Sequence, residues 1–459
     1  TLMIPLIPEL PALLDTSPAN ASWTITVTLL TAAVATPVFG RLGDMYGPKP
    51  MLMICAAAMT VGSLMAAVAS SLLPFIIGRG LQGMSLPIIP LAISVLRSAL
   101  PTERVGPAMG LISSSLGVGG ALGLPVSAVI AQKADWHMLF WSAGVLGVMA
   151  LLLFGFLVPD VPASSADKFD PLGTLLLAVG LVTLLLPISK GSTWGWTSTT
   201  TLSLFLVSLA VFAVFARWQF RTPTPIVDLR TTLRRPVLTT NIAAILVCFA
   251  MFAFGLVAPQ ALELPTGTGY GLGQSMVQAG LWLAPGGLAM MLASPLAARV
   301  AARRGPKFTL VCGSAIIAVA YLGAVWLLGS PPAVMVVNIV ISLGVGFAYS
   351  SLPALINAAV PVSETAAANG INALARSLGT SISSAVIGVV LATMTIAYGG
   401  HTMPSLNGLR AALLIAAAVA ALAAVIAMTI PRTDEPDESA LSDWAAEEAE
   451  LAGDPLIRG

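Results

Sequence analysis

Charge, histidine and cysteine are all scarce in this sequence. Only 9% of its 459 residues are charged, the net charge is +1, and no basic cluster with interleaved aromatic residues occurs. These features exclude a nucleic-acid-binding protein and predict no nucleic-acid partner. The three cysteines, Cys55, Cys248 and Cys312, lie far apart in apolar runs without metal or disulfide spacing, so we interpret them as packed thiols.

Motifs for catalysis are missing as well. The sequence contains no G-x4-GK[ST] stretch, the motif that binds the phosphates of ATP, which excludes ATP hydrolysis by this chain as its energy source. The only two histidines, His137 and His401, lie in predicted outer loops, and no metal-ligand or nucleophile constellation accompanies them. We therefore predict that the chain is not an enzyme and uses no cofactor.

Long apolar runs are what the sequence has instead. Hydrophobic residues make up 57% of it, and the mean hydropathy is +0.93. A hydrocarbon core roughly 30 Å thick takes about 20 apolar residues per helix. Thirteen such runs occur, at 22–42, 50–70, 73–97, 105–130, 136–158, 171–189, 198–217, 237–262, 276–298, 308–329, 333–358, 365–396 and 409–430. The preceding "TLMIPLIPEL" is too short to cross, and we interpret it as the end of a truncated first helix. The sequence thus predicts an all-α polytopic membrane protein with 14 transmembrane helices.

The distribution of Lys and Arg predicts the orientation of these helices. If the loops alternate between the two sides, sixteen of the 21 basic residues fall on one side, and the positive-inside rule makes that side cytoplasmic. Both termini are then cytoplasmic, in a multi-pass protein of the plasma membrane. The segment from Thr433 onward holds nine of the 20 acidic residues and is predicted to be a solvated tail.

An internal repeat divides the chain. "ELP" occurs at Glu9 and again at Glu263, "GPK" at Gly47 and at Gly305, and a Pro-to-Gly spacing at 101–110 and at 361–370, in the same order and with offsets of 254, 258 and 260. We predict an N-terminal six-helix bundle over 1–158, a linker with two inserted helices over 159–236, a C-terminal six-helix bundle over 237–430 and a tail over 431–459. Two repeated halves are a transporter architecture, with the substrate site between them near the midplane.

Several motifs resemble the major facilitator superfamily, and in particular its fourteen-helix drug:proton antiporters. "GRLGDMYGPK" is similar to the signature of the loop between the second and third helices, although Met45 and Pro48 stand where that signature has basic residues. "GRGLQG" resembles the fourth-helix signature and supplies Arg79 as its arginine. The glycine-rich run over 105–130 resembles the antiporter signature, with Gly123-Leu124-Pro125 in place of its Gly-Pro pair. The resemblance implies the major facilitator fold and proton-coupled export.

The resemblance also implies roles in gating. Asp44 would hold the cytoplasmic side shut by meeting the start of the 365–396 helix near Ser363 and Glu364, and it would pair with Arg41 or Lys49. The alternative is a helix cap with no switching role. Gly119, Gly123 and Pro125 would let their helix bend and slide as a moving interface, or would simply pack closely.

Proton coupling has few candidate residues. Arg79 lies several residues inside its span, where an unpaired charge is costly; it either tunes a neighbouring carboxylate or is a structural hydrogen-bond hub. Glu9 and Glu263 lie near the outer ends of their helices. Each is either a proton carrier or a solvated residue with no role in transport. Arg376, the other arginine within a span, either extends toward the inner face, which we favour, or shares in the coupling.

Polar and aromatic residues in apolar spans are the candidates for substrate binding. They are Gln82, Asn241, Gln260, Gln278, Trp282, Asn357 and Asn372, and they suit a large amphipathic ligand. We predict a monomeric exporter, surrounded by membrane lipids, that exchanges protons for a lipophilic or cationic small molecule. The alternatives are a lipid or natural-product exporter with a lateral entrance at the inserted helices, and a membrane receptor or scaffold that uses the acidic tail.

Overall fold

The computed structural model describes residues 10–21, 23–101, 134–163, 169–361, 364–398 and 401–431, together with eleven scattered positions between 104 and 130. Within this part of the chain, twelve helical segments are long and apolar enough to cross a membrane. They coincide with twelve of the thirteen predicted spans. The thirteenth, 105–130, and residues 1–9 of the predicted truncated helix lie outside the continuously described ranges.

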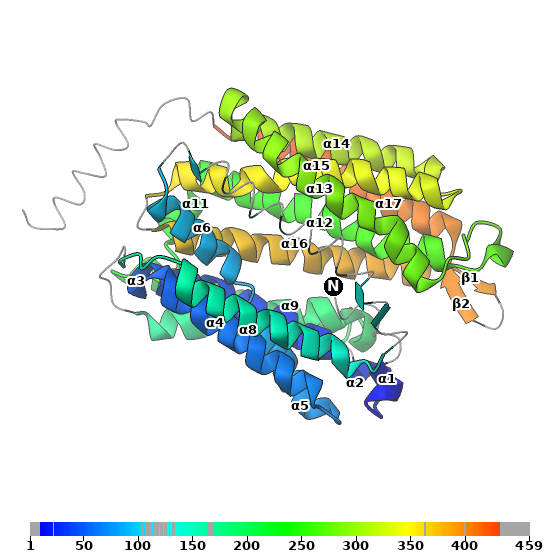
Figure 1. Cartoon of the computed structure of the whole chain (residues 1–459), viewed down its shortest axis with the longest axis horizontal. Coiled ribbons are helices and arrows are strands. Elements are labelled where there is room, and N and C mark those ends of the chain that lie inside the picture. Colours follow the sequence, from blue (N-terminus) through cyan, green and yellow to red (C-terminus); the bar gives the residue numbers. More distant parts are fainter. Residues whose placement is uncertain are drawn as a thin grey trace, which may run out of the picture.

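The N-terminal half begins with the short helices α1 (Leu10–Leu13) and α2 (Pro18–Ala21). The long helices follow as α3 (Trp23–Tyr46), α4 (Pro48–Ala67), α5 (Leu72–Gly83), α6 (Ile88–Ala99) and α8 (His137–Leu157). Figure 1 shows α3, α4, α5 and α8 as one group of the bundle, on the opposite side of α16 from α14 and α15.

The predicted continuous span 73–97 is two helices, α5 and α6, separated by a turn. Leu86 N–H donates to the Gly83 carbonyl and Ile88 N–H to the Ser85 carbonyl, so the chain winds more tightly here than in an α-helix. The cause is Pro87, which has no N–H to donate, and Pro90, whose ring would clash with the carbonyl four residues earlier. The regular α-helical hydrogen bonding is therefore interrupted between Gly83 and Ile88.

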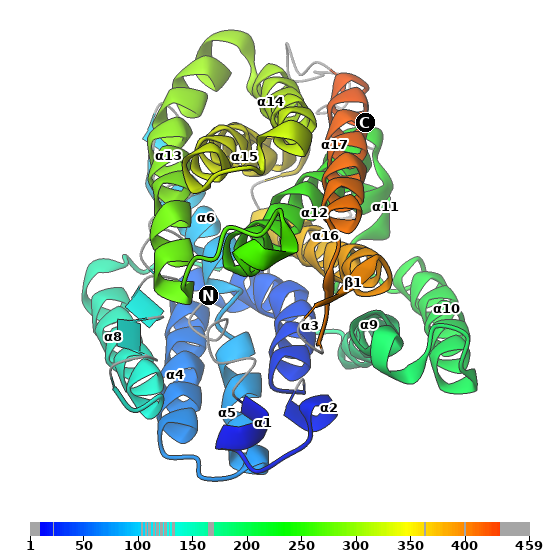
Figure 2. The ribbon, with the colours of Figure 1, turned by 90° about the vertical axis from the view of Figure 1, so that its right-hand side faces the viewer.

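The inserted helices are α9 (Pro171–Trp194) and α10 (Thr199–Gln219), followed by the short α11 (Leu229–Leu233). Leu177, Leu181 and Leu185 of α9 share a buried cluster with Ala33 of α3 and Leu374 of α16. Figure 2 shows α9 beside both α3 and α16, with α10 on its outer side. The insert thus packs along the line where the two halves meet.

The C-terminal half comprises α12 (Arg235–Glu263), the turn η2 (Thr266–Thr268), α13 (Met276–Arg304), α14 (Pro306–Leu327), α15 (Pro331–Ala359), α16 (Thr365–Thr393) and α17 (Leu406–Met428). A two-stranded antiparallel hairpin, β1 (Thr395–Tyr398) and β2 (His401–Pro404), joins α16 to α17. The prediction of an all-α protein therefore missed this hairpin. The helix α16 ends at Thr393, whereas the predicted span continued to residue 396 and included the start of β1.

The two halves repeat each other in local geometry. Gly47 between α3 and α4 has φ 88° and Gly305 between α13 and α14 has φ 83°, and each is followed by a proline at the start of a helix. This left-handed conformation favours glycine. The helices that follow also cross alike, since a Cβ on Gly62 would lie 2.5 Å from the carbonyl oxygen of Gly78, and one on Gly313 would lie 2.6 Å from that of Gly344.

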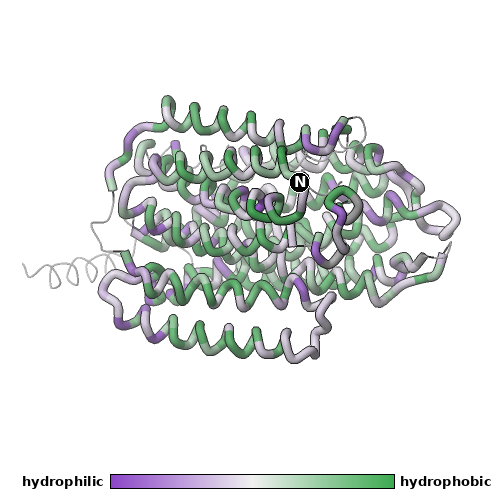
Figure 3. The backbone as a smooth tube through the Cα atoms, turned by 90° about the horizontal axis from the view of Figure 1, so that it is seen from below, coloured by the Kyte–Doolittle hydropathy of each residue, from purple (hydrophilic) through white to green (hydrophobic). Residues whose placement is uncertain are grey.

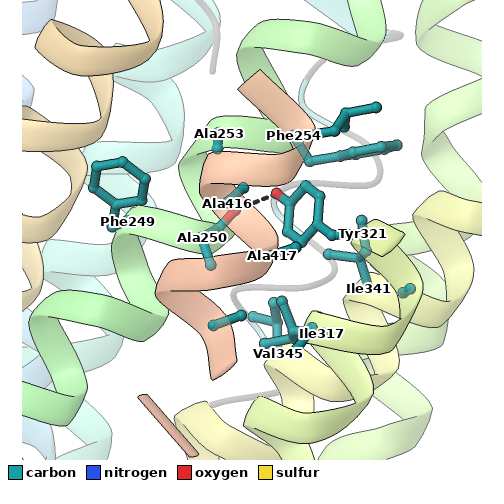
Figure 4. Close-up of a cluster of buried hydrophobic side chains, with 14 of the residues drawn as sticks. Phe249, Ala250, Ala253, Phe254, Ile317, Tyr321, Ile341, Val345, Ala416 and Ala417 are labelled. Atoms are coloured by element: carbon teal, nitrogen blue, oxygen red, sulfur yellow. Dashed lines mark hydrogen bonds between the residues drawn. The ribbon is translucent and has the colours of Figure 1, made fainter. Parts of the chain in front are cut away.

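The interior is built mainly of small residues. In the C-terminal half, Ala250, Ala416 and Ala417 surround the fully buried ring of Tyr321, whose hydroxyl donates to the Ala250 carbonyl (Figure 4). Large apolar side chains such as Phe156, 84% exposed, and Trp326, 74% exposed, point outward. Figure 3 shows hydrophobic residues along most of the length of the helices. This inside-out distribution suits a bundle surrounded by lipid, where helices associate through close packing.

Candidate functional site: a contact between the halves and a polar face on α16

Asp44 joins the two halves at one end of the bundle. Asp44 lies in the last turn of α3, on the buried side of the helix. Its carboxylate accepts hydrogen bonds from Ala366 N–H at 3.1 Å and from Ala367 N–H at 2.8 Å. These are first-turn amides of α16, which have no partner within the helix and carry the positive end of its dipole. A charged acceptor on two such donors is a strong contact, and Asp44 is only 1% exposed. We call this contact the Asp44 latch.

Arg97 strengthens the same junction from a second helix. It lies in the last turn of α6 and donates to the Thr365 hydroxyl and, at 3.2 Å, to the Val360 carbonyl. Sequence reasoning did not assign it a role, although a basic residue in the last turn of a helix is a recognisable signal. Together Asp44 and Arg97 connect two N-terminal helices to the start of α16.

The backbones of α3 and α16 touch beside the latch. A Cβ on Gly40 would lie 2.8 Å from the Ala366 carbonyl oxygen, and a Cβ on Gly370 would lie 3.0 Å from the Thr36 carbonyl oxygen. Only glycine allows this approach without a shift of one helix. Gly40 of the loop signature and Gly370 of α16 thus set the distance at which Asp44 reaches the α16 amides.

Glu364, which precedes α16, adds a second carboxylate to this end. Burial raises the pKa of its carboxyl, and the negative charge of Asp228 before α11 raises it further, while Thr231, Arg41 and Arg234 partly offset the rise. Asp228 and Glu364 line one small cavity of about 30 Å³ between α11 and α16. The positive charge of Arg41 acts on both Asp44 and Glu364. Sequence reasoning named Glu364 only as a neighbour of the contact and missed Asp228, because α11 follows the insert.

Lys49 is paired elsewhere. Its ammonium lies 3.2 Å from a carboxylate oxygen of Asp160, whose side chain is 90% exposed. Such an exposed pair contributes little to stability. Of the two predicted basic neighbours of Asp44, the structure therefore brings Arg41 to the latch and places Lys49 beside the loop after α8.

Arg79 sits in a hydrogen-bond network inside the N-terminal half. Its guanidinium donates to the Gln82 side-chain oxygen and, at 3.4 Å, to the Thr24 carbonyl of α3. The Gln82 amide donates in turn to the Ser63 hydroxyl of α4 at 2.8 Å. Three helices are thereby linked through one arginine and one glutamine, an arrangement that matches the structural-hub interpretation and leaves a coupling role as a prediction.

Asparagines line one face of α16. The Asn369 amide donates to Asn357 of α15 at 2.6 Å, and the Asn372 amide donates to Asn241 of α12 at 2.9 Å. Arg376, one turn further along, donates to the Asn372 side-chain oxygen at 3.2 Å. The expectation that Arg376 extends to the inner face is wrong, because α12 and α15 enclose its side chain and leave it 6% exposed.

The other predicted residues are dispersed. Gln260 bonds within its own helix, and Gln278 forms a capping box with Ser275 at the exposed start of α13. Trp282 donates to Gln274, and Glu263 is exposed at the end of α12.

Four of the gating and coupling predictions lie in undescribed or sparsely described parts of the chain. Glu9 and Pro125 fall outside the described residues, and Gly123 has no described neighbour. Among the described residues, a Cβ on Gly119 would meet nothing within 4 Å, and the gating role of this glycine stays a prediction.

An apolar cavity of about 500 Å³ opens between the insert and the N-terminal half. Its lining comes from α3, α9 and the Met84 turn and includes Val27, Thr31, Phe39, Met84, Thr174 and Val182. Nearly all of these side chains present carbon atoms, so the cavity suits a hydrocarbon group. In the described part of the chain no three His, Cys, Asp or Glu residues gather to hold a metal ion.

These features define a polytopic membrane protein of two repeated helical halves, joined at one end by a buried charged contact. The Major Facilitator Superfamily model matches residues 1–384, and the chain belongs to this family. Its members are transporters.

Comparison with individual proteins agrees with this assignment. A multidrug resistance protein B homolog of Mycobacterium tuberculosis is 30% identical over 65% of this chain and 55% of its own length, so the match spans about half of that relative. The tetracenomycin C resistance and export protein of Streptomyces glaucescens is 26% identical over 83% of this chain and 70% of its own. The crystal structure of the human organic anion transporter MFSD10 has a TM-score of 0.67 at 15% identity, over 93% of this chain and 94% of that one, which shows the same fold.

Proposed function

We propose that this chain is a secondary active exporter, which moves lipophilic or amphipathic small molecules out of the cell in exchange for protons by alternating access. The observation that carries the proposal is the Asp44 latch. A carboxylate on two backbone amides closes one end of the bundle, and it can release when the halves rock apart. A receptor or scaffold has no need of such a breakable contact.

The drug-like character of the substrate is supported by relatives that are named for drug resistance and export. The orientation predicted from basic residues makes the Asp44 end cytoplasmic, so the described conformation is closed toward the cytoplasm. Arg79, Glu9 and Glu263 remain the candidates for coupling to protons, and the protein is proposed to act as a monomer in the plasma membrane.

The test is transport by the purified protein in proteoliposomes with an imposed pH gradient and a panel of lipophilic dyes. We expect gradient-driven movement of dye by the wild type. Asp44→Asn loses the negative charge that the α16 amides bind, and hydrogen bonds to a charged group are worth about 1.5–3 kcal/mol each. We therefore expect its rate, and that of Arg79→Ala, to fall by about tenfold or more.

The matched control is Asp160→Asn, which removes an exposed carboxylate near the same end and should leave the rate unchanged. Wild-type rates from Asp44→Asn would remove the latch from the mechanism. If well-folded wild-type protein moved no dye along the gradient, the exporter proposal would fail.

A second candidate is an exporter of lipids or of lipid-like natural products that enter sideways. The apolar cavity between α3 and α9 favours it, because its lining would receive a hydrocarbon chain at the side of the bundle. The same liposome assay with a short-chain fluorescent phospholipid separates the two candidates. Gradient-driven movement of the phospholipid, with none of the dyes moved, would favour the second.

A further inference from the structure

A polar stripe runs along α16 through an otherwise apolar core. Asn369, Asn372, Arg376 and Ser383 are three, four or seven residues apart and so share one face of the helix. All four side chains are at least nine-tenths buried. A buried polar group is costly unless it is hydrogen-bonded, and a buried charge is more costly still.

Arg376 is the centre of this face. One of its five N–H groups donates to Asn372, and its guanidinium carbon lies 4.8 Å from the ring centroid of Tyr349 on α15. No carboxylate of the described residues forms an ion pair with it, and Tyr349 is only partly buried. The guanidinium is thus held in place by an amide and an aromatic face, and these neutralise none of its charge.

The sequence also offers no carboxylate from another span. None of the thirteen apolar runs contains Asp or Glu, the run 105–130 included, and Asp44 and Glu263 lie at helix ends just beyond two of the runs. Arg376 is the twelfth of the 29 residues of α16, roughly 17 Å along the helix axis at 1.5 Å per residue. That is near the middle of a core about 30 Å thick, far from lipid headgroups at either surface.

Two further polar atoms on this face have no partner among the described residues. They are Asn369 Oδ1, two turns before Arg376, and Ser383 Oγ, two turns after it. Buried polar atoms are nearly always satisfied, so each of these two atoms can take a hydrogen-bonding group that the described residues do not supply. The face therefore combines a cation without a counter-charge and unpartnered polar atoms on both sides of it.

We propose that the α16 face centred on Arg376 binds an acidic group of the transported molecule, such as a carboxylate, sulfonate or phenolate. The inference rests on the proposed export function and narrows its substrate class from lipophilic compounds in general to lipophilic acids. The guanidinium offers two parallel N–H groups to an oxyanion, and the Tyr349 ring offers an apolar surface to the rest of the molecule. Asn372, itself held by Asn241, fixes the orientation of the guanidinium.

Two matched dyes test the proposal. 8-Anilino-1-naphthalenesulfonate and N-phenyl-1-naphthylamine share one skeleton and differ by the sulfonate, and their binding is measured calorimetrically on protein in nanodiscs, with empty nanodiscs subtracted. We expect Arg376→Gln to weaken binding of the sulfonate at least tenfold and to leave the neutral dye unaffected. Arg376→Lys keeps the positive charge but lacks the planar guanidinium, so its affinity for the sulfonate should lie between those of the wild type and Arg376→Gln.

Arg410→Gln is the control, because Arg410 lies on α17 and donates to the Val325 carbonyl, away from this face. It should bind both dyes as the wild type does. The proposal is overturned if the wild type does not bind the sulfonate, if Arg376→Gln binds it as well as the wild type, or if both dyes are lost equally from Arg376→Gln and from Arg376→Lys.

Flux of the sulfonate dye along a pH gradient is measured on the same protein preparation. Failure of that flux, with sulfonate binding still dependent on Arg376, would count against the export proposal and leave the anion site standing. Gradient-driven flux, with sulfonate binding that does not depend on Arg376, would support the export proposal and count against the anion site.

Discussion

At the scale of single residues, the proposed functions rest on three buried charges whose neighbours differ. Asp44 is satisfied by two backbone amides, whereas Arg79 is satisfied by a glutamine and a backbone carbonyl. Arg376 donates to an asparagine side chain, and its guanidinium lies over an aromatic ring. Each charge has therefore a different capacity to accept a further partner, and that capacity decides which one can switch or bind.

Glu364 gives a pH-dependent prediction at this scale. Its pKa in the folded protein lies above that of an unfolded chain, about 4.3, because burial and Asp228 favour the protonated form. The stability conferred by the protonated form is complete below the unfolded value and is lost as pH rises through the folded pKa. Glu364→Gln removes that loss.

We therefore expect Glu364→Gln to melt at a higher temperature than the wild type at pH 8 and at the same temperature at pH 4. Thermal unfolding in detergent at the two pH values measures it. A variant that is less stable than the wild type at pH 8 would show that the ionised carboxylate stabilises the fold, contrary to this account.

At the scale of elements, glycine contacts set how the helices meet. Gly40 and Gly370 bring α3 against α16, and the Gly62–Gly78 and Gly313–Gly344 crossings recur in the two halves. A helix contact through backbone atoms is short and specific, so a single methyl group changes it. Closure of the Asp44 end depends on this spacing as much as on the charge.

Gly40→Ala tests that dependence. Its Cβ would stand 2.8 Å from the Ala366 carbonyl oxygen, which belongs to the backbone and cannot rotate away. Overpacking of this kind costs about 1–3 kcal/mol, so hydrogen exchange of the Ala366 and Ala367 amides should accelerate by about tenfold or more.

Gly388→Ala on α16 is the control, because its new methyl group would meet nothing within 4 Å. It should leave exchange at Ala366 and Ala367 as in the wild type. If Gly40→Ala also left it unchanged, α3 and α16 would not be held together by this close approach.

At the scale of the whole molecule, two repeated halves are joined at one end and flanked by an insert. Asp44 accepts two hydrogen bonds and Arg97 donates two at the end of the bundle that also carries α11. The β1–β2 hairpin lies at the opposite end of the bundle (Figure 1). If the basic residues orient the bundle as predicted, this joined end faces the cytoplasm, and the described conformation is closed on that side.

Reporter fusions measure this orientation. Alkaline phosphatase inserted after Trp196, in the loop between α9 and α10, should be active because that loop is predicted to be outside. Green fluorescent protein placed after Gly459 should fluoresce because the tail is predicted to be cytoplasmic. An inactive phosphatase after Trp196, with an active one after Gly459, would invert the topology and place the Asp44 latch on the outer face.

Much of the fold could be predicted from the sequence, because the requirement is local. A helix in lipid must bond its own backbone and present about 20 apolar residues, so the apolar runs predicted the twelve described spans. The repeated GPK motif marked the two similar turns at Gly47 and Gly305. The class of protein and the family followed from these patterns and from the loop signature around Asp44.

Only the tertiary structure decided which polar groups meet. The amides that hold Asp44 lie 322 and 323 residues away along the chain, and Gln278 proved to be a helix cap while Asn241 reached Asn372. Arg376 has an arginine's long, flexible side chain, and sequence alone favoured extension to the surface. Its burial depends on α12 and α15 enclosing it, and the packing of separate helices is not a local property of any of them.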